Sequence, residues 1–120
     1  MPYSISWFDP DKILFMQAPG SISEADVFDA DRELRETLTR AKSNRIHLII
    51  DDSKMLSMPG VSVTMKIKTL DHPKMGWTVV IGQSDKVYRM LYTITCHLRK
   101  LPLYFALNMD EAATFLSKTQ

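Results

Sequence analysis

The chain opens with two short apolar runs in the pattern of a β-hairpin. Tyr3, Ile5 and Trp7 alternate with serines, and a period of two is typical of a strand with one buried face. A second run, Ile13 to Met16, follows an Asp-Pro-Asp sequence that favours a turn. These runs predict two neighbouring antiparallel strands that end before Gly20.

Three later segments carry apolar residues at the spacings of three and four that are typical of an amphipathic helix. The first has capping-box spacing at Ser23 and Asp26, or at Ser21 and Glu24, and ends at Ser43. Ser84 or Asp85 caps the second, and Asn108 with Glu111 caps the third. The faces expected to be buried comprise Val27, Ala30, Leu34, Leu38 and Ala41 in the first helix, Val87, Met90, Leu91, Ile94 and Leu98 in the second, and Ala112, Phe115 and Leu116 in the third.

Three other apolar runs predict strands, and one segment is ambiguous. Ile46 to Ile50 is almost continuously apolar, as in a central strand covered on both faces. The other two predicted strands are Trp77 to Ile81 and Leu101 to Leu107. In Met58 to Leu70 the apolar residues alternate as in a strand, but Pro59 suits a first helical turn. The order of the surrounding elements favours a helix over 58–70.

The resulting order, ββαβαβαβα, predicts an α/β fold in a single domain over residues 1–120. Strands separated by single helices imply right-handed crossovers and a mostly parallel sheet. The hairpin adds an antiparallel strand at one edge, and the helices pack on the sheet.

Composition narrows the classes of partner and compartment. Apolar residues make up 45% of the 120, charged residues 24%, and the net charge is +1, which argues against a nucleic-acid or membrane-surface footprint. The longest apolar runs are far shorter than the roughly 20 residues of a membrane span. The lone cysteine, Cys96, and a start without signal-peptide character predict a cytoplasmic protein.

Several strings, in order along the chain, carry a family resemblance. They are RIHLIIDDS, MPGV, HPKMGWTVVIG and NMDEAATFL. In sequence and spacing, between about Lys12 and Leu116, the chain resembles the bacterial STAS domains, and more closely their SpoIIAA-like, anti-sigma-factor-antagonist-type branch and an uncharacterised branch found in Chloroflexi. The resemblance implies a STAS-like sandwich that binds partners and has no enzyme activity.

The resemblance also points to a regulatory segment, Asp51 to Gly60. Signalling members carry a phosphorylated serine at the start of the helix after the third strand, where free amides and the helix dipole stabilise a dianion. Ser57, expected to cap that helix, is the nearest match, and Ser53 follows Asp52. The Asp-Ser-Ser-Gly string of those members is replaced here, which puts phosphorylation in doubt. The segment, with the helix beginning at Pro59, is the expected docking surface for an unidentified protein partner, and a homodimer remains open.

Other polar residues predict no catalytic centre. Asp51 and Asp52 are strand neighbours that point to opposite faces, so turn and capping roles are expected for both. The three histidines lie on different elements without metal-ligand spacing, and no cofactor motif occurs. Cys96 is expected to be a buried, inert thiol.

An alternative function rests on the eight methionines. Met55, Met58 and Met65, with Trp77 expected nearby, would line a pocket for a small apolar, lipid-like ligand. A carrier of this kind needs a cavity of roughly 300 Å³ or more. A second surface, formed by Tyr88, Arg89 and Tyr92 on the more exposed side of their helix, is a further candidate for interaction.

Overall fold

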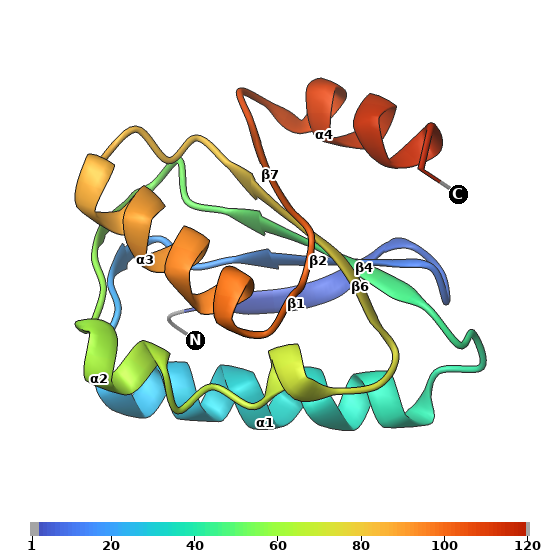
Figure 1. Ribbon diagram of the computed structural model, residues 1–120, viewed down its shortest axis with the longest axis horizontal. Coiled ribbons are helices and arrows are strands. Elements are labelled where there is room, and N and C mark those ends of the chain that lie inside the picture. Colours follow the sequence, from blue (N-terminus) through green and yellow to red (C-terminus); the bar gives the residue numbers. More distant parts are fainter. Residues whose placement is uncertain (1–2, 120) are drawn as a thin grey trace.

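A five-stranded sheet forms the centre of the computed structural model, which describes residues 3–119 apart from the side chain of Val61. The spatial order β1-β2-β4-β6-β7 follows the chain (Figure 1). β1 is antiparallel to β2, and every later pair is parallel. The predicted α/β fold, with an antiparallel hairpin strand at one edge, is therefore confirmed. The strands are β1 (Ser4–Asp9), β2 (Ile13–Gln17), β4 (Ile46–Asp51), β6 (Met75–Ile81) and β7 (Leu103–Ala106).

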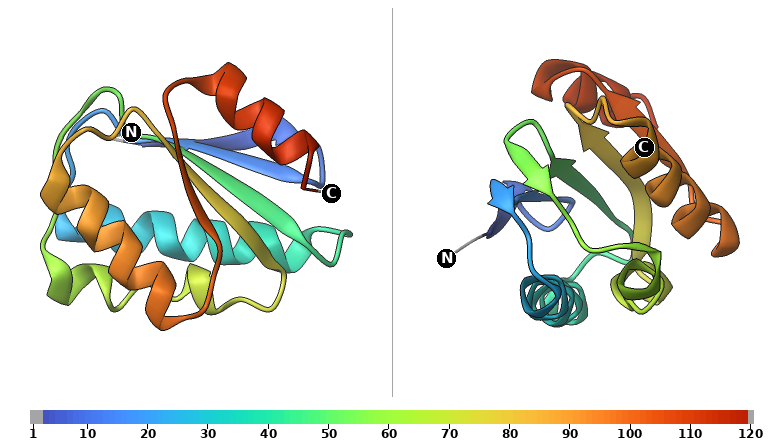
Figure 2. Two further views of the ribbon diagram at one scale, coloured as in Figure 1. Left: turned by 45° about the horizontal axis from the view of Figure 1, so that its top comes forward. Right: turned by 90° about the vertical axis from the view of Figure 1, so that its left-hand side faces the viewer.

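Helices cover both faces of this sheet (Figure 2). One face packs against α1 (Glu24–Arg40), α3 (Lys86–Leu98) and the short connection that contains α2 (Val61–Thr64) and η1 (Thr69–Asp71). The other face packs against α4 (Met109–Ser117), through a core that includes Ile49 and Val79. Two apolar cores thus lie on either side of the sheet. No helix within residues 3–119 is long and apolar enough to cross a membrane.

A second, two-stranded sheet was not predicted. β3 (Gly20–Ser21) lies parallel to β5 (Met55–Ser57). The Ile22 amide also donates to the Ser57 carbonyl at 2.9 Å, and Gly20 has φ of 81°. Two strands of two and three residues carry no readable periodicity, so sequence pattern could not reveal them.

The segment 58–70 contains a helix, but one much shorter than predicted. Only Val61–Thr64 is α-helical, and a 3-10 turn follows at Thr69–Asp71. The carbonyl of Gly60 accepts the first amides of the helix, from Val63 and Thr64. The prediction of one continuous helix over this range is wrong.

A buried carboxylate holds this irregular segment against α1. Asp31, only 5% exposed, accepts hydrogen bonds from the Lys68 amide at 3.0 Å and from the Thr69 amide at 2.7 Å. The Thr69 hydroxyl donates to the same oxygen at 2.6 Å, and Arg35 Nε donates to the other at 3.2 Å. Side-chain bonds to α1 therefore replace the helical bonds that this part of the connection lacks.

α3 is rotated about its axis relative to the prediction. Four of its five predicted buried residues, Val87, Met90, Ile94 and Leu98, are between 41% and 60% exposed. Thr95 and Cys96 are buried instead, and Leu91 and Tyr92 are half-buried.

Polar anchors explain this rotation. The Tyr92 hydroxyl donates to Asp52 at 2.6 Å, and Arg89 lies 4.1 Å from the ring centre of Phe105. At the C-terminal end of α3, the Arg99 guanidinium donates to the carbonyls of Met65 and Ile67. Tyr92 and Arg99 therefore face inward, and the expectation that Tyr92 lies on the exposed side of the helix is wrong.

Candidate functional site

The two neighbouring aspartates at the end of β4 use different partners. Asp51 accepts from Gln17 Nε2 at 3.1 Å and from the Ser53 amide at 2.9 Å. Asp52, 4% exposed, accepts from Gln83 Nε2 at 2.9 Å and from the Tyr92 hydroxyl at 2.6 Å. Each carboxylate thus has a structural role in the loop, as expected from the sequence.

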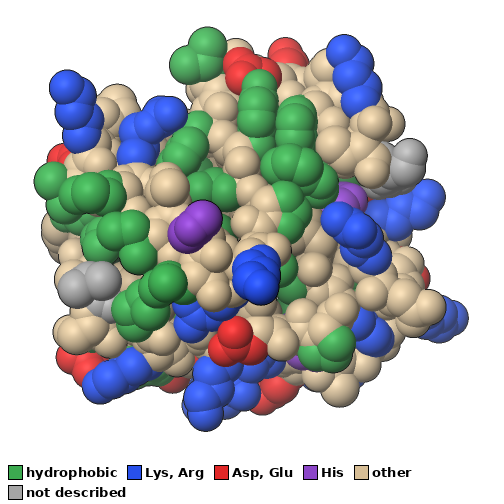
Figure 3. Space-filling model, viewed as in Figure 1, with side chains coloured by type: hydrophobic (Ala, Val, Ile, Leu, Met, Phe, Trp, Pro, Cys, Tyr) green, Lys and Arg blue, Asp and Glu red, His purple; other side chains and the backbone are tan. Residues whose placement is uncertain are grey.

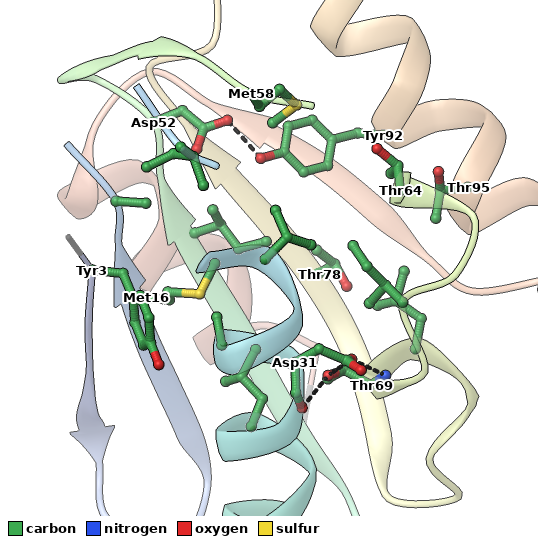
Figure 4. A pocket seen from close by; sticks show the side chains of 18 of the residues that line it. Tyr3, Met16, Asp31, Asp52, Met58, Thr64, Thr69, Thr78, Tyr92 and Thr95 are labelled. Carbon is green, nitrogen blue, oxygen red and sulfur yellow. Dashed lines mark hydrogen bonds between the residues drawn. The ribbon is translucent and has the colours of Figure 1, made fainter. Parts of the chain in front are cut away.

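Asp52 joins three segments at the carboxyl end of the sheet. It follows β4, Gln83 follows β6, and Tyr92 comes from the middle of α3. Figure 4 shows the hydrogen bond between Asp52 and Tyr92. Burial raises the pKa of the Asp52 carboxyl above its ordinary 3.8, although the bonds from Tyr92 and Gln83 act in the opposite direction. Burial and the adjacent Asp52 carboxylate raise the pKa of the Tyr92 phenol well above 10.0. The pair therefore holds a phenol that stays protonated as the donor.

We expect Tyr92→Phe to lower the free energy of unfolding at pH 7.5 by about 1.5–3 kcal/mol, the usual contribution of a hydrogen bond to a charged group. With its pKa raised, folded Asp52 takes up a proton at a higher pH than unfolded aspartate does. Acidification toward pH 4 therefore favours the folded state at this residue. Loss of the hydrogen bond from Tyr92 raises the pKa of Asp52 further, so acidification stabilises the variant more than the wild type. The difference in their free energies of unfolding should therefore shrink at pH 4.5.

Urea unfolding at both pH values measures this difference. Tyr104→Phe is the matched control, because its hydroxyl also donates to a carboxylate at 2.8 Å, but that carboxylate, Glu111, lies on the opposite side of the sheet and is less buried than Asp52. A Tyr92→Phe difference that stays the same or grows on acidification would refute the proposed coupling to Asp52.

The candidate phosphoacceptor serines do not lie at a helix start. Ser57 belongs to β5 and precedes α2 by several residues, so the expectation that it caps this helix is wrong. Ser53 is exposed in the turn between β4 and β5. Gly60 is exposed and supplies the carbonyl on which α2 begins. The free amides and aligned dipole that would stabilise a phosphate are thus not placed at either serine.

A pocket of about 130 Å³ lies between α1, α3, the sheet and the segment 52–60 that contains β5, here called the β5 loop (Figure 4). Met55 and Met58 line it, as predicted, together with Met16. Met65 is not among its lining residues. Trp77 lies on the opposite face of the sheet, where its ring centre is 4.8 Å from that of Phe115. The expected grouping of all four residues is therefore wrong for Met65 and Trp77.

Trp77 is misplaced in the prediction because of strand alternation. Leu48, Ile50 and Val80 face the α1 side, whereas Val79 and Ile81 face α4. Trp77 shares the parity of Val79, which directs its ring toward α4. Alternation along the predicted strand Trp77 to Ile81 already implies this orientation, which is incompatible with the predicted place of Trp77 in the pocket.

The histidines and the cysteine have structural or surface positions. His47 Nδ1 accepts from the Trp77 amide at 2.8 Å, and burial lowers the pKa of its ring. His72 contacts Thr39, and His97 is exposed. Cys96 is buried, and burial raises the pKa of its thiol, as expected for an inert cysteine. Within residues 3–119, no three His, Cys, Asp or Glu side chains are grouped to hold a metal ion.

The exposed side of α3 is the largest departure from the expected packing. Val87, Met90, Ile94 and Leu98, here called the α3 stripe, follow one another at spacings of three and four. Figure 3 shows hydrophobic side chains gathered over this helix, on the face turned to the viewer. The Met58 amide contacts the Tyr88 hydroxyl at 3.4 Å, so the β5 loop adjoins the start of the stripe. The α3 stripe and the β5 loop together form a surface to which another molecule can bind.

The architecture defines a class: a mixed five-stranded sheet with an antiparallel first strand, three parallel crossovers on one face and a C-terminal helix on the other. Comparison with solved structures identifies it as the SpoIIAA-like fold. An uncharacterised DUF3478-family protein from Shewanella loihica PV-4 aligns over 95% of this chain and 91% of its own, with a TM-score of 0.70 and 16% identity.

Two further solved structures share this fold. The unphosphorylated anti-sigma factor antagonist SpoIIAA aligns over 98% of this chain and 99% of its own, with a TM-score of 0.68 and 11% identity. An anti-sigma factor antagonist from Mycobacterium paratuberculosis covers 96% and 94%, with a TM-score of 0.61 and 16% identity. No protein-family model and no curated protein matches the chain. The resemblance to the SpoIIAA-like, STAS-type fold is thus confirmed.

Proposed function

We propose that this chain is a non-catalytic, cytoplasmic regulatory module that binds a protein partner through the α3 stripe and the adjoining β5 loop. The observation that carries the proposal is the exposure of four large apolar side chains on one helix face. Contiguous exposed apolar surface marks interaction sites more often than chance. Two of the solved structures described above are anti-sigma factor antagonists, which supports a regulatory role.

The charge around the stripe indicates the chemistry of the partner. Lys86, Arg89 and Lys100 are exposed in or next to α3, and residues 86–109 contain no aspartate or glutamate. A second copy that docked through the same helix would bring like charges together, which disfavours such a homodimer. The partner that fits is a protein segment with an apolar face and acidic flanks, such as an amphipathic helix.

The hydrogen bonding of the loop supports docking in preference to catalysis. Asp51 and Asp52 are both engaged by neighbouring side chains or amides, and Ser57 takes part in β5. Phosphorylation of Ser53 or Ser57 is not part of the proposal, because neither lies at a helix N-terminus. The loop instead supplies the exposed Leu56 side chain, 77% accessible, as a further apolar contact.

Photo-crosslinking in lysate of the source cells tests this proposal. A benzoylphenylalanine at Met90 should give a discrete protein adduct, and Ile94→Glu should abolish it. The matched control places the same probe at Ser117, which is exposed on α4, and should give no such adduct. Ile94 is 41% exposed, so the Ile94→Glu chain should keep its thermal unfolding midpoint within a few degrees.

Other outcomes contradict the proposal. An adduct with the mass of two chains would assign the stripe to self-association, and an adduct with lipid alone would assign it to a membrane surface. Equal adducts at residues 90 and 117, or an adduct insensitive to Ile94→Glu, would show that the stripe is not a specific docking surface.

A further inference from the structure

Two buried hydroxyl groups have no oxygen or nitrogen hydrogen-bond partner. They belong to Thr78 of β6, 1% exposed, and Thr95 of α3, 2% exposed. The polar side chain beside that of Thr78 is the Cys96 thiol, a weak partner. No other side-chain nitrogen or oxygen buried within residues 3–119 lacks a partner. A buried polar group without a partner costs free energy, and such groups need an explanation such as an absent ligand or water.

Both hydroxyl-bearing residues line the same pocket, the one described above between α1, α3 and the sheet. In Figure 4 they lie on the side of the pocket opposite Tyr3 and Met16. The sheet order places them there, because Tyr3 and Met16 belong to the β1 and β2 end, whereas Thr78 belongs to β6. The pocket is therefore apolar along most of its wall, and its two unpartnered hydroxyls lie at one side.

The size of the pocket limits what it can hold. Its volume is about 130 Å³, and an apolar cavity of about 150 Å³ in another protein admits benzene. A long acyl chain does not fit, since ligand pockets for such molecules are several-fold larger, at roughly 300–1,000 Å³. The lipid-sized ligand expected from the sequence is thus too large for this pocket.

The charges around the pocket limit the ligand further. Its charged lining residues are all acidic, namely Asp26, Asp31 and Asp52, and no lysine, arginine or histidine contributes to the wall. All three carboxylates are already held by donors from the protein. A carboxylate or phosphate ligand would meet like charge without a counter-ion, whereas a neutral molecule would not.

We propose that the pocket binds a small neutral molecule with a compact apolar body and one hydroxyl or carbonyl group, which Thr78 and Thr95 recognise by hydrogen bonding. This inference goes beyond the docking function and does not depend on it, because the α3 stripe faces solvent and the pocket lies on the inner side of the same helix.

Benzyl alcohol, toluene and benzoate are suitable probes, observed by chemical-shift changes in the labelled full-length chain. Benzyl alcohol and toluene should both shift the amides of lining residues such as Ala30 and Thr78, whereas benzoate should not. Thr78→Val keeps the side-chain shape and removes the hydroxyl. It should weaken benzyl alcohol binding about fivefold, the effect of one ordinary hydrogen bond, and leave toluene binding unchanged.

Thr114→Val, an exposed threonine on α4, is the matched control and should change neither affinity. Thr78→Val should be at least as stable as wild type, because it removes an unpartnered hydroxyl. The proposal is overturned if neither neutral probe shifts the lining amides at millimolar concentration. Equal binding of benzoate and benzyl alcohol, or benzyl alcohol affinity unchanged by Thr78→Val, would overturn it as well.

Discussion

Asp31→Ala is expected to lower the free energy of unfolding by about 3 kcal/mol, although aspartate is a common surface residue on helices. The substitution removes the acceptor of two backbone amides and one hydroxyl in a buried position. Buried donors that lose a charged acceptor carry most of the loss, because water cannot replace it. Chemical denaturation monitored by circular dichroism measures the change.

Two further variants make this prediction specific. Asp29→Ala removes a carboxylate from the same helix whose 3.5 Å contact with Arg32 is exposed, and it should change stability by less than about 0.5 kcal/mol. Asp31→Asn keeps an acceptor oxygen for the amides of Lys68 and Thr69 and should recover part of the loss. Equal effects of Asp31→Ala and Asp29→Ala would show that the contacts of Asp31 with the segment after α2 contribute little.

Gly76→Ala is the second substitution with a large expected effect. It should lower the free energy of unfolding by about 2–3 kcal/mol, the upper range for overpacking. A Cβ at this position would lie 2.5 Å from His47 Nδ1 and 2.8 Å from its Cε1. His47 is itself buried, so its ring has little room to move. The register explains the crowding: Ile46 pairs with Met75 and Leu48 with Thr78, so two residues of β6 stand opposite His47.

This irregularity frees the Trp77 amide from the strand ladder, and His47 Nδ1 accepts it at 2.8 Å. The His47→Ala substitution removes the ring that would clash with the new Cβ. In that background we therefore expect Gly76→Ala to lower the free energy of unfolding by less than about 1 kcal/mol. Such a non-additive result is typical of residues in contact. Gly60→Ala, which meets nothing within 4 Å, is the control for the loss of a glycine. Full additivity of the His47 and Gly76 substitutions would contradict the proposed contact.

Periodicity predicted the sheet and three of the helices correctly because their apolar positions are dense. Ile46 to Ile50 and Trp77 to Ile81 became buried strands, and the Ser23–Asp26 capping box starts α1 as one of the two predicted alternatives. The order of these elements predicted an α/β fold, and the resemblance carried by the four strings quoted above implied the SpoIIAA-like fold.

The candidate site was harder to predict because distant polar contacts shape it. The contacts of Tyr92 with Asp52 and of Arg99 with carbonyl oxygens after α2 decide which side of α3 faces inward. An apolar count on a helical wheel assigns the inner face to the α3 stripe instead. Asp31 was missed for the same reason, since nothing near it in sequence indicates that it binds residues 37 and 38 positions later. Nothing in the sequence marked Thr78 as a ligand-binding candidate, because threonine is common in strands.

The spatial order of the main sheet has a consequence for synthesis on the ribosome. Each parallel strand adds next to the one made just before it, from β2 through β4 and β6 to β7. A growing chain can therefore extend a sheet edge that already exists, without waiting for a distant partner. The face that carries Ile49 and Val79 gains its helix only when α4, which follows all of these strands, emerges. During that interval this face is the surface most exposed to a chaperone or to another nascent chain.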